Sequence, residues 1–160
     1  MSQDTIDIPA GYTPLMPERK QDYMGLIGPF YVRPLDHGLC IGIRLEFRHC
    51  NPFKEAHGGF MTAMADLSLG ACLLHSEARP PSVATLSLTS NFLAPPRLGD
   101  WVEAHARPDR VGLRIAFASV DFMVAGERVG YASGTFKVFT AEAMQRRRER
   151  GREGRAPTAS

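Results

Sequence analysis

One charged side chain stands alone in a long apolar segment of the sequence. From Gly58 to Ser76 the only charged residue is Asp66, and most of its neighbours are Met, Ala and Leu. A carboxylate among apolar side chains costs free energy unless it is paired or solvated in a cavity, and such placements concentrate at functional sites. Asp66 is therefore the first candidate catalytic residue, as a general base or a nucleophile. The alternative is a structural carboxylate that caps a neighbouring loop.

A second group of residues, at the start of the same segment, could bind an oxygen atom. His57, Gly58 and Gly59 precede the apolar run, and Asn51 lies six positions before His57. Paired glycines let a backbone approach a ligand closely, so Gly59 is also expected to contact substrate. Free N–H groups at a helix start, together with the Asn51 amide, suit a carbonyl oxygen that becomes an oxyanion. Taken singly, each of these features is better explained as a turn.

The surrounding pattern predicts how these residues are positioned. Met, Ala and Leu favour a helix from His57 to His75, about 19 residues or roughly 28 Å long. Alternating apolar residues from Leu39 to Phe47 predict a strand with one buried face, and Ala125-Gly126-Glu127 predicts a hairpin. The order β–β–α–β–β–β–β favours an α+β fold in which one antiparallel sheet wraps around a buried helix. The expected strands are 26–33, 39–47, 82–94, 100–107, 111–124 and 128–139.

Composition bounds the rest of the chain. We expect one domain at residues 23–140, an arm laid over it at 1–22, and an Arg/Glu-rich tail at 141–160 with a helix to about Arg150. Without that tail the chain has 13 basic and 14 acidic residues, which gives no sign of nucleic-acid binding. No apolar run is long enough for a membrane span, and no signal-peptide pattern is seen. The sequence therefore predicts a cytoplasmic protein that binds neither nucleic acid nor membrane.

The cysteines and the other histidines suggest no second chemistry. Cys40, Cys50 and Cys72 are widely spaced and odd in number, as expected of free thiols. Cys72 lies in the apolar run, where a core residue is favoured over a nucleophile. Four histidines show no metal-ligand spacing with one another or with the cysteines, so we expect no metal and no cofactor; they are His37, His49, His75 and His105.

Taken together, the motifs resemble those of the PaaI-like, phenylacetate-pathway type of hotdog-fold thioesterase. The resemblance covers about residues 37–139. It differs at Lys54, where the family often has glycine. It implies the hotdog fold, and hydrolysis of an acyl-CoA thioester in which coenzyme A is part of the substrate. The matching strings are Asn51-x5-His57-Gly58-Gly59-x6-Asp66, Phe92-Leu93-Ala94-Pro95 followed by Gly99-Asp100, and Gly134-Thr135-Phe136.

The resemblance also implies a role for each site residue. The Gly58 N–H and the Asn51 amide would polarise the thioester carbonyl. Asp66 would activate water or attack directly, and Thr85 would orient the water. His57 would support the loop or the leaving thiolate. Two rivals remain: a hotdog dehydratase or hydratase, which uses a different string, and a non-catalytic acyl-CoA sensor, which would not need Asp66. The acyl group stays open between aryl and medium-chain.

Helix geometry adds a prediction about assembly. Gly58 and Asp66 are eight residues apart, which is about 12 Å along a helix axis. Groups that act on one carbonyl must converge to roughly 3 Å from the reacting atoms. A two-fold dimer with antiparallel central helices would bring Gly58 of one chain to Asp66 of the other, and the resemblance implies the same arrangement. We therefore expect a homo-oligomer, a dimer or a tetramer built as a dimer of dimers, with shared active sites.

Overall fold

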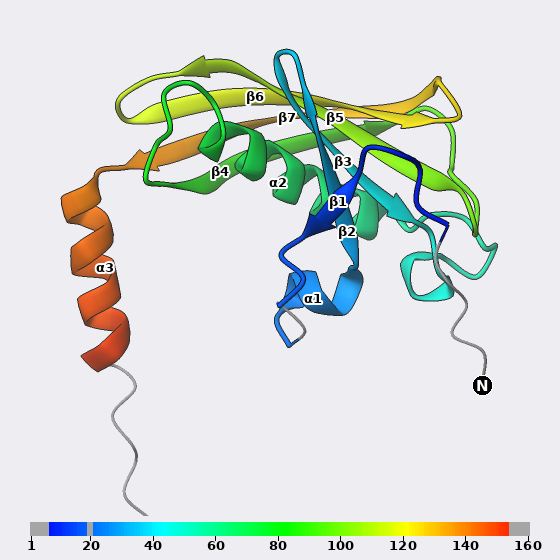
Figure 1. The fold of residues 1–160 in the computed structure, drawn as a ribbon, viewed down its shortest axis with the longest axis horizontal. Coiled ribbons are helices and arrows are strands. Elements are labelled where there is room, and N and C mark those ends of the chain that lie inside the picture. Colours follow the sequence, from blue (N-terminus) through cyan, green and yellow to red (C-terminus); the bar gives the residue numbers. More distant parts are fainter. Residues whose placement is uncertain (1–6, 19–20, 154–160) are drawn as a thin grey trace, which may run out of the picture.

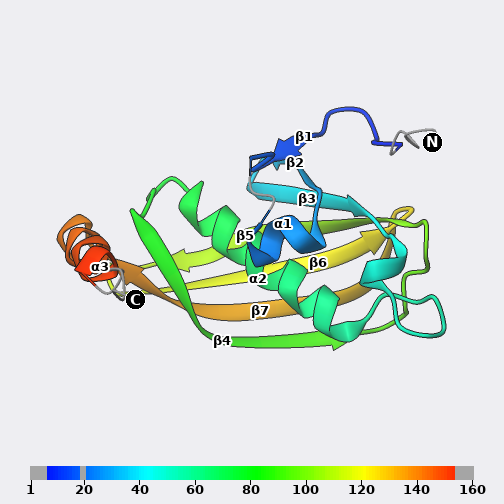
Figure 2. The same cartoon turned by 90° about the horizontal axis from the view of Figure 1, so that it is seen from below.

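A seven-stranded antiparallel sheet curves around one long helix (Figures 1 and 2). The computed structural model describes residues 7–18 and 21–153. Neighbouring strands follow the order β1-β2-β3-β5-β6-β7-β4, so the strand that comes directly after the long helix lies at one edge. The strands are β1 Thr13–Leu15, β2 Phe30–Leu35, β3 Gly38–Arg44, β4 Ser82–Phe92, β5 Trp101–Val111, β6 Ile115–Val124 and β7 Glu127–Phe139.

The long helix α2, Gly58–Leu74, packs on the inner face of the sheet. His57 caps its start and His75 its end, so the predicted helix is confirmed to within one residue at each end. Its sheet-facing side chains are buried among apolar residues of the strands, while Asp66 lies on a partly exposed stripe. The result is the predicted α+β hotdog fold. Three short or peripheral helices complete the chain: α1 Tyr23–Ile27, the 3-10 turn η1 Phe47–His49, and α3 Ala141–Glu153.

Three strand predictions need correction. The first strand was expected at 26–33, but it runs from Phe30 to Leu35, because the residues before it form α1. We expected Phe47 on the buried face of a strand, but β3 ends at Arg44 and the Phe47 side chain is 72% exposed. A capping box between Glu46 and His49 turns the chain into η1 at this point. We also expected a break after residue 107, whereas β5 continues to Val111. The register shifts between Pro108 and Arg110, and this bulge accommodates a proline inside a strand.

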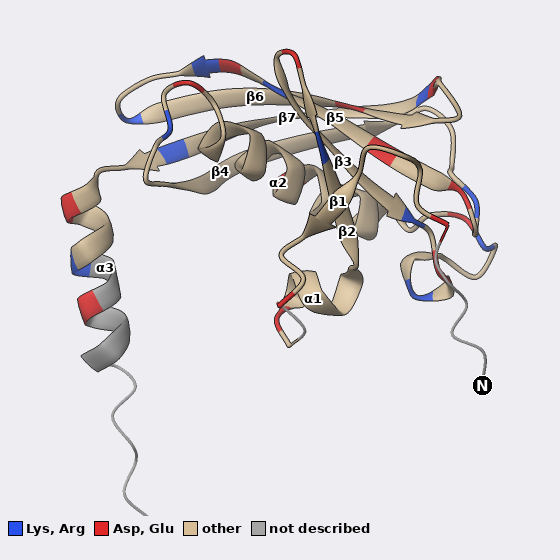
Figure 3. Cartoon of the chain, in the orientation of Figure 1, with Lys and Arg blue, Asp and Glu red and all other residues tan. Residues whose placement is uncertain are grey.

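The N-terminal arm packs on the sheet, whereas the C-terminal helix α3 does not (Figure 1). The arm adds β1 to the sheet, and Tyr12 lies on the outer sheet face against Trp101, with ring centroids 5.1 Å apart. At the other end α3 leads away from the body of the sheet (Figure 1). Charged residues gather at hairpin ends, in connecting loops and on α3 (Figure 3). Among the described residues, no helix combines the length and apolar character that crossing a membrane requires.

Candidate active site

Asn51 lies in a tight loop between η1 and α2, and this loop fixes the orientation of its side chain. The Asn51 Oδ1 accepts hydrogen bonds from the backbone N–H groups of Phe53 and Glu55, at 2.9 and 3.1 Å. These bonds identify which side-chain atom is oxygen, because only the oxygen can accept. The Nδ2 group therefore points away from the turn, and no acceptor binds it within the described residues. The Asn51 side chain thus closes the turn through its oxygen and leaves its amide group as an available donor; its contact with a substrate stays a prediction.

Lys54 shows how the chain follows a glycine-like path without glycine. Its φ is 62°, in the left-handed region that glycine adopts most easily. The Lys54 N–H donates to the Asn51 carbonyl at 3.0 Å, and the Lys54 carbonyl accepts from Leu98 at 2.9 Å. The residue that departs from the resembled family is therefore held in the conformation a glycine would take, and the turn around Asn51 is retained.

At the start of α2, the backbone N–H of Gly58 has no acceptor among the described residues. His57 caps the helix: its Nδ1 accepts the Gly59 N–H at 3.0 Å. When neutral, this ring therefore has its proton on Nε2, on an exposed edge. Gly58 rather than Gly59 has the available N–H. The role of His57 toward the loop or the leaving thiolate, and substrate contact by Gly59, stay predictions.

A small apolar pocket of about 180 Å³ opens beside Gly58. A Cβ at position 58 would lie 3.4 Å from the Phe92 ring, so the missing side chain keeps the backbone open toward this space. The pocket therefore offers an apolar slot next to a free N–H group. Its lining residues are Ala56, Gly58, Met61, Phe92, Leu93, Ala94, Pro95 and Pro96.

Asp66 meets Thr85 halfway along α2. The Thr85 Oγ1 donates to the Asp66 Oδ1 at 2.5 Å, a short charge-assisted contact. A bulge in β4 between Thr85 and Ser87 changes the register against β7, and such bulges re-aim side chains next to active sites. The structure thus brings together the two residues that were expected to handle water. Thr85 is exposed and Asp66 only partly buried, so water reaches both.

The oxygen-binding end and the carboxylate do not meet within one chain. Gly58 is the first residue of α2 and Asp66 the ninth, so the two are about 12 Å apart along the axis. Both ends face β4: Phe92 lies by Gly58, and Thr85 lies by Asp66. In Figure 2, β4 borders α2 along one side and has no further strand beyond it. Each chain therefore presents the Gly58 N–H and the Asp66–Thr85 pair at two separate positions along the same edge of the sheet.

His49 contributes to the site indirectly, and sequence reasoning missed this role. Its ring is fully buried, stacks on Phe60 of α2 at 4.5 Å, and accepts the Glu46 N–H on Nδ1. Its carbonyl accepts the His57 N–H at 2.9 Å. Burial, and then the nearby Arg48, lower its pKa and so favour the neutral ring. His49 thereby fixes the loop that presents Asn51. Only its place three residues after Glu46, in the capping pattern, marks it in the sequence.

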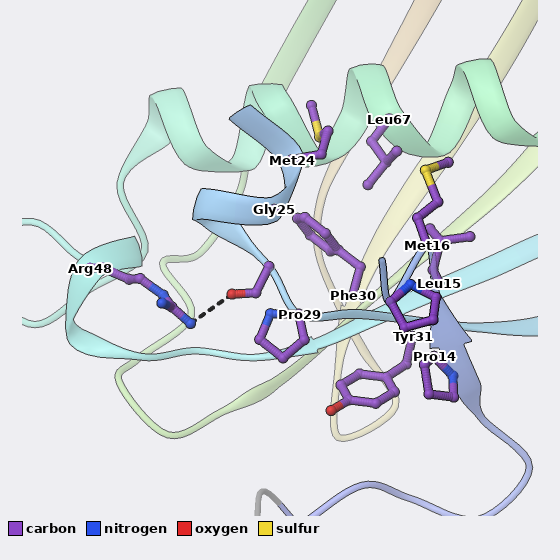
Figure 4. A pocket seen from close by; sticks show the side chains of 12 residues that line it. Pro14, Leu15, Met16, Met24, Gly25, Pro29, Phe30, Tyr31, Arg48 and Leu67 are labelled. Atoms are coloured by element: carbon purple, nitrogen blue, oxygen red, sulfur yellow. Dashed lines mark hydrogen bonds between the residues drawn. The ribbon is translucent and has the colours of Figure 1, made fainter. Parts of the chain in front are cut away.

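A larger apolar pocket lies on the other side of α2 (Figure 4). It has a volume of about 350 Å³ and lies between the arm, α1 and α2, with Met24, Phe30 and Leu67 among its walls. At its rim Arg48 donates to the Gly28 carbonyl at 2.6 Å. Leu67 follows Asp66 directly, but successive helical residues point about 100° apart. The pocket therefore does not contain the Asp66–Thr85 pair.

Comparison with known proteins identifies the family. The sequence profile of the thioesterase superfamily matches residues 53–131. A protein of Pseudomonas aeruginosa that carries the name of an esterase is 38% identical over 133 residues, which cover 82% of this chain and 97% of that one. The chain belongs to the thioesterase superfamily. The matched segment includes the apolar helix, Asp66 and Thr85.

Solved structures agree with this membership. The phenylacetic acid degradation protein PaaI of Thermus thermophilus is 25% identical to this chain, with a TM-score of 0.65. The match covers 73% of this chain and 98% of the Thermus protein. Zebrafish thioesterase superfamily member 2 has a TM-score of 0.68 at 18% identity, covering 75% and 90% of the two chains. The second likeness concerns the fold alone. The predicted resemblance to PaaI-type proteins is confirmed.

Proposed function

We propose that this protein hydrolyses an acyl-CoA thioester to a free acid and coenzyme A. The observation that carries the proposal is the division of the site along β4. At one end of α2, Gly58 and Asn51 each keep a hydrogen-bond donor without a partner among the described residues. In the middle of α2, Asp66 is partly exposed and accepts a hydrogen bond from Thr85. Acyl transfer to water needs both halves, namely donors for a developing oxyanion and a base for water.

In the proposed reaction the two donors bind the carbonyl oxygen of the thioester. Asp66 accepts a proton from water while the water oxygen bonds to the carbonyl carbon, and the negative charge that forms on the carbonyl oxygen rests on the Gly58 N–H and the Asn51 Nδ2. The oxygen lone pair then re-forms the carbonyl, the C–S bond breaks, and the proton on Asp66 passes to the departing thiolate. Thr85, which donates to Asp66, orients the carboxylate.

Direct attack by Asp66 is the alternative within the same function. Its carboxylate would then form an anhydride with the acyl group, and water would cleave this intermediate. A single turnover in ¹⁸O-water separates the two routes, because cleavage at the Asp66 carbonyl leaves the label in the protein only when Asp66 is the nucleophile. Label confined to the released acid indicates a general base, or cleavage of the anhydride on its substrate side; trapping of the acyl group on the protein with hydroxylamine separates these two, because only the nucleophilic route forms an acyl-enzyme.

The apolar slot beside Gly58 favours a substrate whose acyl group is apolar next to the thioester carbonyl. Its walls are aliphatic and aromatic, so the part of the substrate next to the carbonyl would lie there rather than in water. We further propose that two copies assemble so that Gly58 and Asn51 of one chain face Asp66 and Thr85 of the other. A homodimer is the smallest assembly that completes a site.

The test is release of free thiol from a panel of aryl-, medium-chain and short-chain acyl-CoA esters. Asp66→Asn keeps the size of the side chain and removes its basicity, so turnover should fall by about 10²–10⁴ while the substrate still binds. The matched control is Asp36→Asn, on the exposed turn between β2 and β3, which should leave turnover unchanged.

Binding without thiol release from any ester of the panel would refute hydrolysis and favour the sensor. Turnover of Asp66→Asn within threefold of wild type would remove Asp66 from the mechanism. A lowered melting temperature with retained turnover would instead assign Asp66 the structural role that remains open from the sequence.

A further inference from the structure

A group of metal-ligating side chains lies on the outer face of the sheet, away from α2. Cys40 of β3 is directly opposite His105 of β5, and Glu103 is two residues before His105, on the same face. One ligand atom from each of the three side chains lies within 4.8 Å of the other two. Spacing along the sequence gives no sign of this group, because the strand register alone brings Cys40 to His105.

The group is shielded but not closed. Cys40 is fully buried, whereas the Glu103 and His105 side chains are 24% and 33% exposed. The Tyr12 hydroxyl covers them from the arm: it lies 2.9 Å from the Cys40 Sγ and donates to Glu103. The His105 Nε2 lies 3.0 Å from the second Glu103 oxygen. Burial raises the pKa of the Cys40 thiol to about 11, which excludes it as a free nucleophile.

We propose that Cys40, Glu103 and His105 bind a zinc ion on the outer face of the sheet. A thiolate, an imidazole and a carboxylate are the three donor types that zinc accepts, at about 2.0–2.3 Å, and a sulfur donor disfavours Mg²⁺ and Ca²⁺. Three of the four tetrahedral positions are thus supplied from two adjacent strands, which hold their side chains in fixed register. The Tyr12 hydroxyl, which contacts both the thiol and the carboxylate, stands beside the fourth.

Charge supports an ion of this valence. A zinc ion would meet one thiolate and one carboxylate, which together balance its charge of two. Arg33 lies 3.8 Å from Glu103 and over the Tyr12 ring at 5.3 Å, and it also acts directly on the Cys40 thiol. Its positive charge favours the thiolate that zinc requires. The competing interpretation is a set of hydrogen bonds that fastens the arm to the sheet and binds no metal. The two interpretations differ in one measurable property, the formation of a metal–sulfur bond.

Cobalt(II) reports that bond directly in the full-length chain after treatment with EDTA and a reductant. One equivalent per chain should produce a thiolate-to-cobalt charge-transfer band in the near ultraviolet and strong visible bands of a four-coordinate ion, and zinc should bleach both. Cys40→Ser should abolish the charge-transfer band. Cys50→Ser, which changes a cysteine outside the group, is the matched control and should leave the band unchanged.

His105→Asn provides a second test that avoids the buried cysteine, because its side chain is partly exposed. This variant should fold by circular dichroism and bind zinc at least about tenfold more weakly. Absence of a charge-transfer band with excess cobalt overturns the proposal. So does a band that survives Cys40→Ser, a band lost in Cys50→Ser, or a folded His105→Asn with wild-type zinc affinity. None of these readouts depends on thioester hydrolysis.

Discussion

The sharpest test of the proposed site is subunit complementation between two inactive variants. Along one α2 helix, eight residues separate Gly58 from Asp66, a rise of about 12 Å. An Asp side chain bridges only a small part of that distance, while reacting groups must come to within roughly 3 Å. The Asp66 carboxylate is, moreover, turned toward Thr85 on β4 rather than toward the helix start. Under the proposed mechanism, one chain alone therefore cannot complete a site.

Mixing Asp66→Ala with Asn51→Ala should restore activity if two chains share each site. Random exchange makes about half of the dimers mixed. In a mixed dimer one site lacks both groups, and the other has both wild-type residues. About one quarter of all sites are then intact, so thiol release should recover to about one quarter of the wild-type rate. If both residues served a site within one chain, no intact site would form at any mixing ratio.

A reversed mixture supplies the matched control. Wild type is mixed in equal amount with a chain that has both substitutions, Asp66→Ala and Asn51→Ala. With shared sites, exchange lowers activity from about one half of an all-wild-type sample to about one quarter, because every mixed dimer is dead. With sites inside one chain, activity stays at one half. Mass spectrometry must confirm exchange in both experiments; an unrecovered first mixture and an unchanged second one would refute the shared site.

Four other perturbations have defined outcomes. Asn51→Ala removes one oxyanion donor and should lower kcat by about 10²–10³, more than it changes KM, in a steady-state assay. A chain ending at Thr140 should fold and keep kcat; a raised KM for CoA esters but not for short thiol esters would mean that the arginine tail contacts the nucleotide. Lys54→Gly relieves about 1–2 kcal/mol of left-handed strain and costs about 0.5–1 kcal/mol in chain entropy. Urea unfolding should therefore show a gain in stability of up to about 1.5 kcal/mol, and a loss would contradict the strain argument. Burial lowers the pKa of His49, so below about pH 6.5 the unfolded chain binds a proton that the folded chain does not readily bind. The contribution of His49 to stability is therefore full above that pH and is lost as the pH drops toward the folded pKa. In His49→Gln, the melting temperature should fall less steeply with decreasing pH than in wild type.

Periodicity and local chemistry account for most of the fold. The apolar helix, the strand after it and the Ala125-Gly126 turn follow from patterns inside single segments, and the structure confirms them; both turn residues have positive φ. The failures come from interactions that a local pattern does not contain. Phe47 continues the alternation of β3 but leaves it, because the Glu46–His49 capping box ends the strand.

The candidate site likewise contains one residue that the local sequence indicates and one that it does not. Asp66 was conspicuous because a lone carboxylate in an apolar helix is costly, whereas Thr85 was chosen from the family resemblance alone. Nothing local marks Thr85, because its position against Asp66 depends on the bulge in β4 and on the packing of that strand beside α2. The pairing of Cys40 with His105 was likewise hidden, since it needs the register between β3 and β5.

The edge strand β4 relates the separation of Gly58 from Asp66 to the proposed pairing of two chains. β4 is eleven residues long, pairs only with β7 among the described strands, and has Leu86 56% exposed. A long edge strand with exposed apolar side chains invites pairing with another chain, and proteins usually blunt such edges with charge or proline. From Ser82 to Phe92 this strand has neither a charged residue nor a proline. The same edge borders both halves of the proposed site, since Thr85 and Phe92 are its contacts with Asp66 and Gly58. A second copy seated on β4 would therefore cover the exposed edge and bring the oxyanion donors of one chain to the carboxylate of the other, so that a single contact explains both features.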